Sequence, residues 1–298
     1  MEIKVYQVDT FTSKPFKGNP AGVVLDLNGL SEKDMQNIAR EMNLSETAFI
    51  IPIDENNYKV RFFTPVSEVD LCGHATIASF YTLAFKNIIP PVYEGIKKVY
   101  QETRVGKLGV EISYKGGEVE KIMMDQSKPE DLGVIAEIDL LLSCLNIQKE
   151  DIGIGEKFIN PRIISTGLPD IQLPIKNKKL LDNLIVDYKR LANLSKKTNT
   201  IGLHAFHLPE KNSDKVYVRN FAPLVGINEE SATGTANGGL VYFLKEEGYI
   251  NKRQIVAIQG ESLKRPSQIY CIADKDNRDY NIKVGGQGRI VLEGFIYF

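Results

Sequence analysis

An internal repeat is the feature that most restricts how this 298-residue chain can fold. Residues 47–76 recur as residues 204–237, in each case as a run rich in aromatic and β-branched residues, a proline, and a small-residue segment that begins at glycine. The matched pairs include Phe49 with Phe206, Arg61 with Arg219, and Gly73 with Gly234. Their offsets of 157, 158 and 161 change only across loops, as small insertions would make them. The repeat therefore predicts a duplicated unit.

A weaker match extends the repeat towards the N-terminus. Residues 18–24 align with residues 167–173 at an offset of 149. We therefore expect two homologous domains, residues 1–125 and residues 126–298, with a linker near residues 125 to 160. A strand from either terminus is allowed to cross over between the halves.

Each half is predicted to contain strands followed by one buried helix. Residues 60–63 and 216–221 have strand composition and stop before a proline. Residues 73–85 and 234–244 carry small or apolar residues all round, which is typical of a buried helix. The fold class is α/β (α+β), with two pseudo-symmetric domains. Each is a curved, mostly antiparallel sheet or barrel around a central apolar helix.

Other segments have more ordinary patterns. Residues 31–42 predict a surface helix capped by Ser31, because their apolar residues form one stripe. Two hairpins are also expected, over residues 111–124 and 270–284.

The composition excludes several classes of protein. The chain has 37 basic and 38 acidic residues, so its net charge of −1 gives no basic patch for nucleic acid or an anionic membrane. Its apolar runs fall far short of the ~20 residues that span a bilayer. The N-terminus lacks a secretory signal, so a cytoplasmic protein is expected. The 3 cysteines include no C-x-x-C pair, and no metal site is expected.

The two helix starts, at Gly73 and Gly234, are candidate binding sites. The first turn of a helix has backbone N–H groups without intrahelical partners and a partial positive charge, so it can bind a carboxylate. If the halves pair symmetrically, both starts can face one cleft between them. The alternative is ordinary capping, by Asp70 or Cys72 in one half and by Ser231 or Thr233 in the other.

Three glutamates are candidate acids or bases for such a cleft. Glu46 lies among apolar residues and matches Leu203 in the repeat, so we expect it to be half-buried, with a pKa raised towards neutrality. The alternative is a solvated strand glutamate. Glu229 and Glu230 precede the second helix, where acidic residues are favoured in any case.

The same segments resemble the PhzF-like isomerase family of phenazine biosynthesis, along the whole chain. The motifs that carry the resemblance are residues 16–23, 43–49, 61–65, 70–76, 165–169, 232–236, 259–260, 265–267 and 284–286. The resemblance implies the diaminopimelate-epimerase fold and an enzyme without cofactor or metal, usually a homodimer.

Matched position by position, the resemblance places the catalytic glutamate of the family at Glu46. The implied substrate-binding residues are Ser45, Gly73, His74, Glu230, Gly234 and Thr235. Two of them depart from the family, which usually has aspartate where this chain has Glu230 and serine where it has Thr235. Both positions keep their functional group, so the departures affect the size and pose of the substrate more than the reaction type.

The resulting hypothesis is an isomerase in which Glu46 moves a proton between carbons of a small carboxylate-bearing substrate. One alternative is an epimerase that uses Glu46 and Cys72 as an opposed pair. A two-thiol racemase is disfavoured because Thr233 occupies the second cysteine position. The other alternative is a binding protein for a small acid, without turnover.

Overall fold

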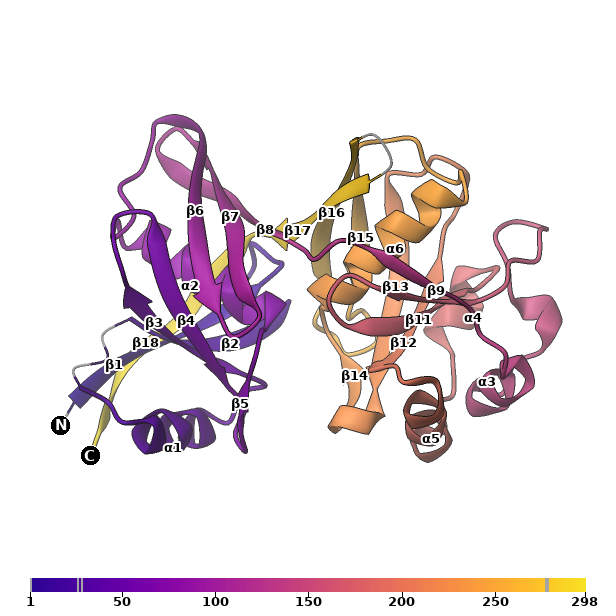
Figure 1. Ribbon diagram of the computed structural model, residues 1–298, viewed down its shortest axis with the longest axis horizontal. Coiled ribbons are helices and arrows are strands. Elements are labelled where there is room, and N and C mark those ends of the chain that lie inside the picture. Colours follow the sequence, from indigo (N-terminus) through magenta and orange to yellow (C-terminus); the bar gives the residue numbers. More distant parts are fainter. Residues whose placement is uncertain (1, 26, 28, 277–278) are drawn as a thin grey trace. The chain divides into compact units, whose positions relative to one another are not determined.

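The computed structural model describes residues 2–25, 27, 29–276 and 279–298, and the chain divides into two compact units (Figure 1). Unit 1 comprises Met1–Asp125 and Gly285–Phe298, and unit 2 comprises Gln126–Val284. The last 14 residues, which the simple division at residue 126 placed in the second half, thus belong to unit 1.

Unit 1 is a curved sheet with one long central helix. Its strands pair in the order β18, β1, β2, β3, β4, β6, β7, β8, with short β5 also on β4. Among the pairs just named, the β2–β3 and β4–β6 pairs are parallel and the others antiparallel. The elements are β1 (Glu2–Thr10), β2 (Asn19–Val24), α1 (Glu32–Met42), β3 (Thr47–Pro52), β4 (Asn57–Phe63), β5 (Glu68–Val69), α2 (Gly73–Phe85), β6 (Glu94–Thr103), β7 (Gly106–Lys115), β8 (Glu118–Asp125) and β18 (Gly288–Tyr297).

Unit 2 repeats this plan with added helices. Its strands pair in the order β9, β10, β11, β12, β13, β15, β16, with β14 on β13, and the β11–β12 and β13–β15 pairs are parallel. The elements are β9 (Glu130–Val134), α3 (Ile138–Leu145), η1 (Lys149–Asp151), β10 (Arg162–Ser165), β11 (Pro169–Pro174), α4 (Lys178–Asp182), α5 (Tyr188–Thr198), β12 (Gly202–His207), β13 (Lys215–Ala222), η2 (Pro223–Val225), β14 (Ile227–Glu230), α6 (Gly234–Glu246), β15 (Gln254–Gln259), β16 (Ser267–Asp276) and β17 (Asp279–Gly286).

The strand pairings show how the repeat is built. In unit 1, β1 pairs with β2 on one side and β18 on the other, and in unit 2, β10 pairs in the same way with β11 and β9. Each outer strand follows a strand of the other repeat along the chain, since β9 comes after β8 and β18 comes after β17. The two repeats therefore exchange their last strands.

The parallel pairs also correct the weaker part of the sequence alignment. Gly22 lies opposite Thr47 in β2–β3, and Gln172 lies opposite His204 in β11–β12. Since Thr47 and His204 are equivalent in the repeat, Gly22 corresponds to Gln172, an offset of 150 (172 minus 22). The offset of 149 predicted for this segment was wrong by one residue.

The two central helices are buried, as the sequence predicted. Every residue of α2 from His74 to Ala84 is buried, and most of α6 is. Hydroxyl groups inside α2 are satisfied locally, because Thr76, Ser79 and Thr82 each donate to the carbonyl four residues earlier. A helix can therefore hold polar residues in a core without unpaired groups.

The surface elements also follow their patterns. Helix α1 has a capping box between Ser31 and Asp34 and buries Met35, Ile38 and Ala39 in the core of unit 1. The hairpin predicted over residues 111–124 is formed by β7 and β8. Helices α3 and α5 pack against the core of unit 2 and were not predicted. None of the helices in the described part of the chain is long and apolar enough to span a membrane.

Candidate active site

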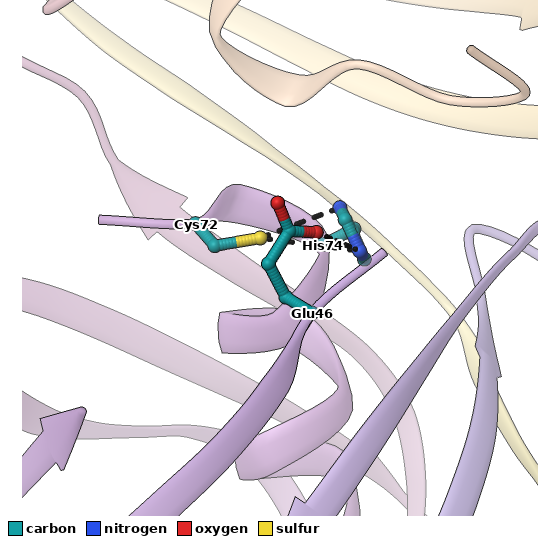
Figure 2. A group of neighbouring side chains, drawn as sticks. All are labelled: Glu46, Cys72 and His74. Carbon is teal, nitrogen blue, oxygen red and sulfur yellow. Dashed lines mark hydrogen bonds and ion pairs between the residues drawn. The ribbon is translucent and has the colours of Figure 1, made fainter. Parts of the chain in front are cut away.

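Three side chains meet at the start of α2 in unit 1 (Figure 2). Glu46 lies just before β3, Cys72 is the N-cap of α2, and His74 is its second residue. Glu46 Oε2 lies 3.0 Å from His74 Nε2, and Cys72 Sγ lies 3.4 Å from His74 Nδ1. The side chains of Glu46 and His74 are only 14% and 5% exposed, so the solvated-glutamate interpretation is excluded.

The electrostatics of this cluster reverse one expectation. Burial alone raises the pKa of Glu46, but the charge and hydrogen bond of His74, with a hydrogen bond from Cys72, outweigh it. The net pKa of Glu46 is below its usual range, and the prediction of a pKa raised towards neutrality was wrong. Burial lowers the pKa of His74, but its contacts with Cys72 and Glu46 hold that pKa well above the usual range. The pair is therefore a carboxylate and an imidazolium at neutral pH.

Cys72 is a neutral thiol in this setting. Burial and the nearby Glu46 charge raise its pKa to about 11. One donor atom from each of Glu46, Cys72 and His74 lies within 4.8 Å of the others, a spacing that a metal ion could bridge. Binding would have to displace the protons of both Cys72 and His74, whereas the cluster already satisfies its own charges. An enzyme without metal stays a prediction.

The start of α6 in unit 2 carries a second polar cluster. Glu230, at the end of β14, accepts a hydrogen bond of 2.7 Å from the hydroxyl of Thr233, the N-cap residue. Gly234 and Thr235 form the first turn, and the hydroxyl of Thr166 donates to the carbonyl of Thr235 at 2.9 Å. The predicted residues of the second half thus do gather at this helix start.

Gln259 organises this helix start and was not among the predicted site residues. Its Oε1 accepts from the Thr233 N–H at 3.1 Å and from Asn237 Nδ2 at 3.0 Å. Its Nε2 donates to the Glu230 carbonyl at 2.8 Å and to the Thr233 hydroxyl at 3.1 Å. The signal in the sequence was a glutamine directly after the apolar run of residues 255–258, in a motif already tied to the family resemblance.

The two neighbouring glutamates of unit 2 have different roles. Glu229 forms a bidentate ion pair with Arg219, at 2.8 Å for each oxygen. The equivalent pair in unit 1 is Arg61 with Glu68, which shows that this ion pair belongs to the repeated framework. Glu230 is therefore the glutamate that remains as a candidate for binding.

Neither central helix is capped by its N-cap side chain. Helices α1, α4 and α5 have such hydrogen bonds, from Ser31, Asn177 and Asp187, whereas Cys72 and Thr233 make none. Capping by Thr233 therefore does not explain the start of α6. At the start of α2, the Ala75 N–H acts on the Cys72 thiol and slightly opposes the rise in its pKa. Of the remaining predicted residues, Gly73 is the first residue of α2, and Ser45 lies exposed in the bend before Glu46.

Comparison with known proteins gives the same architecture. A Bacillus anthracis phenazine biosynthesis protein of the PhzF family has a similar crystal structure, with a TM-score of 0.86, 26% identity, and full coverage of both chains. An uncharacterized isomerase from Clostridium acetobutylicum is 39% identical over 97% of this chain and 96% of its own length. A trans-2,3-dihydro-3-hydroxyanthranilate isomerase from Pseudomonas fluorescens is 32% identical over 94% of each chain.

The fold and these relatives define an isomerase with a two-domain epimerase-like fold, and they confirm the predicted fold class. The family model described as phenazine biosynthesis-like protein matches residues 8–294. The chain therefore belongs to the phenazine biosynthesis-like (PhzF) family.

Proposed function

We propose that this isomerase moves a proton between two carbons of a small carboxylate-bearing substrate, with Glu46 as the general base and then the general acid. The observation that carries the proposal is the buried Glu46 carboxylate, ion-paired with His74 at 3.0 Å beside the start of α2. Burial lets a carboxylate act without competition from bulk water, and the ion pair keeps it ionised and oriented.

The low pKa of Glu46 restricts the substrate. A base with a pKa below its usual range is weak, so the carbon acid must be activated by a neighbouring carbonyl group or double bond. In the first step a C–H bond breaks, the proton passes to a Glu46 oxygen, and the electron pair spreads into the adjacent unsaturated system. In the second step Glu46 returns the proton to another carbon and regains its charge.

The charged His74 has two roles in this scheme. It orients the Glu46 carboxylate through Nε2, and its positive charge stabilises negative charge that develops on the substrate. It also makes protonated Glu46 a stronger acid, so the proton is readily returned.

The substrate carboxylate is proposed to bind at helix starts. The first-turn amides of α2 and α6 have no side-chain cap from Cys72 or Thr233. Such amides bind a carboxylate without a cationic side chain. Glu230 and Thr235 are proposed as further substrate-binding groups of unit 2. The names of the Pseudomonas relatives give their substrate as trans-2,3-dihydro-3-hydroxyanthranilate, a hydroxylated and unsaturated amino acid. Such a substrate agrees with the activated carbon acid that the proposal requires.

The variant Glu46→Gln tests the proposal. It removes the proton carrier at nearly constant shape, and we expect turnover to fall by about 10³-fold. Candidate acids, beginning with trans-2,3-dihydro-3-hydroxyanthranilate, are incubated with the enzyme in heavy water, and product and C–H exchange are followed by NMR. Glu41→Gln, an exposed position on α1, is the matched control and should leave the rate unchanged.

Turnover of Glu46→Gln within a few-fold of the wild type would refute the assignment to Glu46. Binding of an acid without any deuterium exchange in the wild type would instead favour a binding protein, because a passive receptor does not exchange C–H protons.

A further inference from the structure

Asp170 is a buried acid in unit 2 that the proposed reaction does not use. It lies on β11 opposite Gly202 and is only 3% exposed. The Gly202 N–H donates to its carboxylate, but Oδ1 has no hydrogen-bond partner among the described residues. A buried carboxyl oxygen without a partner is costly and calls for an explanation.

Strand register places Asp170 on the face that packs against α6. Its partner on β10 is Ile164, and cross-strand partners share a face. Ile164 lies 3.4 Å from the Cβ position of Gly239 in α6. Two residues after Asp170 on the same face, Gln172 donates to the carbonyl of Ala236 at 3.2 Å. Asp170 therefore lies on the face of β11 that packs against α6, and it is close enough to Glu230, beside the start of α6, to feel its charge.

Three strands of unit 2 carry the titratable or charged side chains to be considered beside Asp170. On β14, Glu230 repels the ionised form of Asp170. On β12, His204 is buried with its pKa lowered to about 4, so it is neutral. On β10, Arg162 is engaged by Asp131 at 2.6 Å. The first turn of α6 contains no titratable side chain. Burial and the charge of Glu230 raise the pKa of Asp170 to about 7.

Two carboxyl groups thus adjoin a helix start that we propose as a carboxylate site. We propose that Asp170 controls anion binding at the start of α6: as a neutral acid it admits the substrate carboxylate, and as an anion it repels it. This inference rests on the proposed function, and it assigns Asp170 as a positioning residue that acts through the charge of the site.

Proton linkage gives a direct test. If the carboxylate binds only when Asp170 is protonated, binding above pH 7 takes up one proton, and affinity falls by about tenfold per pH unit. The probe is anthranilate, which carries the carboxylate and amine of the relatives' substrate and does not titrate between about pH 6 and 8.5. Calorimetry of the full chain in buffers of different ionisation enthalpy measures both affinity and proton uptake.

The variant Asp170→Asn replaces the acid with a neutral group of the same shape. We expect it to bind anthranilate at pH 8 as the wild type does at pH 6, without proton uptake. Ser195→Ala, which alters another buried polar side chain of unit 2, should keep the wild-type pH dependence. If Asp170→Asn does not fold, proton uptake by the wild type still decides the question.

Wild-type binding that is independent of pH, or that is absent at pH 6, would overturn the inference. So would an Asp170→Asn variant with unchanged proton uptake. The proposed function fails separately, because Glu46→Gln should lose turnover yet keep this pattern of binding.

Discussion

At the scale of single residues, the ion pair of Glu46 and His74 decides the chemistry. A buried carboxylate beside Leu44, Ala48 and Phe49 was predictable from the sequence, and so was its expected rise in pKa. The opposite result arises because His74 lies 3.0 Å away, although it is 28 positions distant in the chain. Only the fold brings these two groups together.

The variant His74→Asn tests whether His74 sets the pKa of Glu46. Without the imidazolium, burial dominates and the pKa of Glu46 rises above its ordinary value. Glu46 then becomes protonated at a higher pH, so the acidic limb of the pH–rate profile of kcat should move to higher pH. We also expect roughly a 10²-fold loss of kcat, since the base is no longer oriented.

The control for this variant is His207→Asn, in which the lost imidazole bonds the Ile175 carbonyl in unit 2 at 3.0 Å. It should keep the acidic limb where it is in the wild type. A His74→Asn profile with an unmoved limb would show that His74 does not set the pKa of Glu46.

The same pair makes a pH-dependent contribution to stability, with a definite sign. The folded pKa of His74 is raised, so its contribution is complete below the ordinary value near 6.5 and is lost as the pH rises through the folded value. The folded pKa of Glu46 is lowered, so its contribution is lost as the pH falls through that value. The pair therefore stabilises unit 1 most between the ordinary pKa of glutamate, 4.5, and that of histidine, 6.5.

At the scale of elements, the two central helices were predictable and their surroundings were only partly so. Apolar residues on every face indicated burial of α2 and α6, and the glycines marked where they begin. The supporting residue Gln259 comes from a strand that starts 20 residues after Gly234, and sequence spacing gave no sign of its four hydrogen bonds. Such contacts depend on strand order, which a local pattern does not specify.

We expect Gln259→Leu to disrupt the start of α6. The substitution leaves the Thr233 N–H, Asn237 Nδ2 and the Glu230 carbonyl without these hydrogen bonds in a setting that is buried for Asn237 and partly buried for the other two. Each such group costs about 1–3 kcal/mol, so the free energy of unfolding should fall by about 3 kcal/mol or more. Denaturant unfolding measures this loss.

Gln268→Leu is the matched control, because Gln268 is exposed on the adjacent strand β16. Its effect on unfolding should stay within about 0.5 kcal/mol. Equal stability of the two variants would mean that the Gln259 hydrogen bonds do not hold the helix start.

At the scale of the whole molecule, the duplication was visible in the sequence but the strand exchange was left open. Offsets near 158 residues identified two copies, and the division at residue 125 coincides with the end of β8. A strand pattern alone does not state which sheet the strand joins. The sequence of residues 288–297 is compatible with a last strand in either unit. Their pairing with β1 assigns them to unit 1.

Truncation of the C-terminus tests this assignment. A chain that ends at Gly286 lacks β18, so the β1 amides that face it lose their acceptors, and the core residues Ile3 and Val5 lose their cover. Hydrogen exchange should become roughly tenfold or more faster in β1, although β1 belongs to the opposite end of the sequence. Strands β10 to β13 of unit 2 should keep their protection, measured peptide by peptide by mass spectrometry.

A shorter truncation supplies the graded control. Ending the chain at Phe295 removes only the partners of Glu2 and Ile3, so faster exchange should be confined to the first residues of β1. Loss of protection in unit 2, with β1 unaffected, would show instead that the C-terminal strand supports the half of the molecule in which the sequence places it. The expected pattern follows from the exchanged strands, because each sheet is completed by a segment that follows the other sheet along the chain.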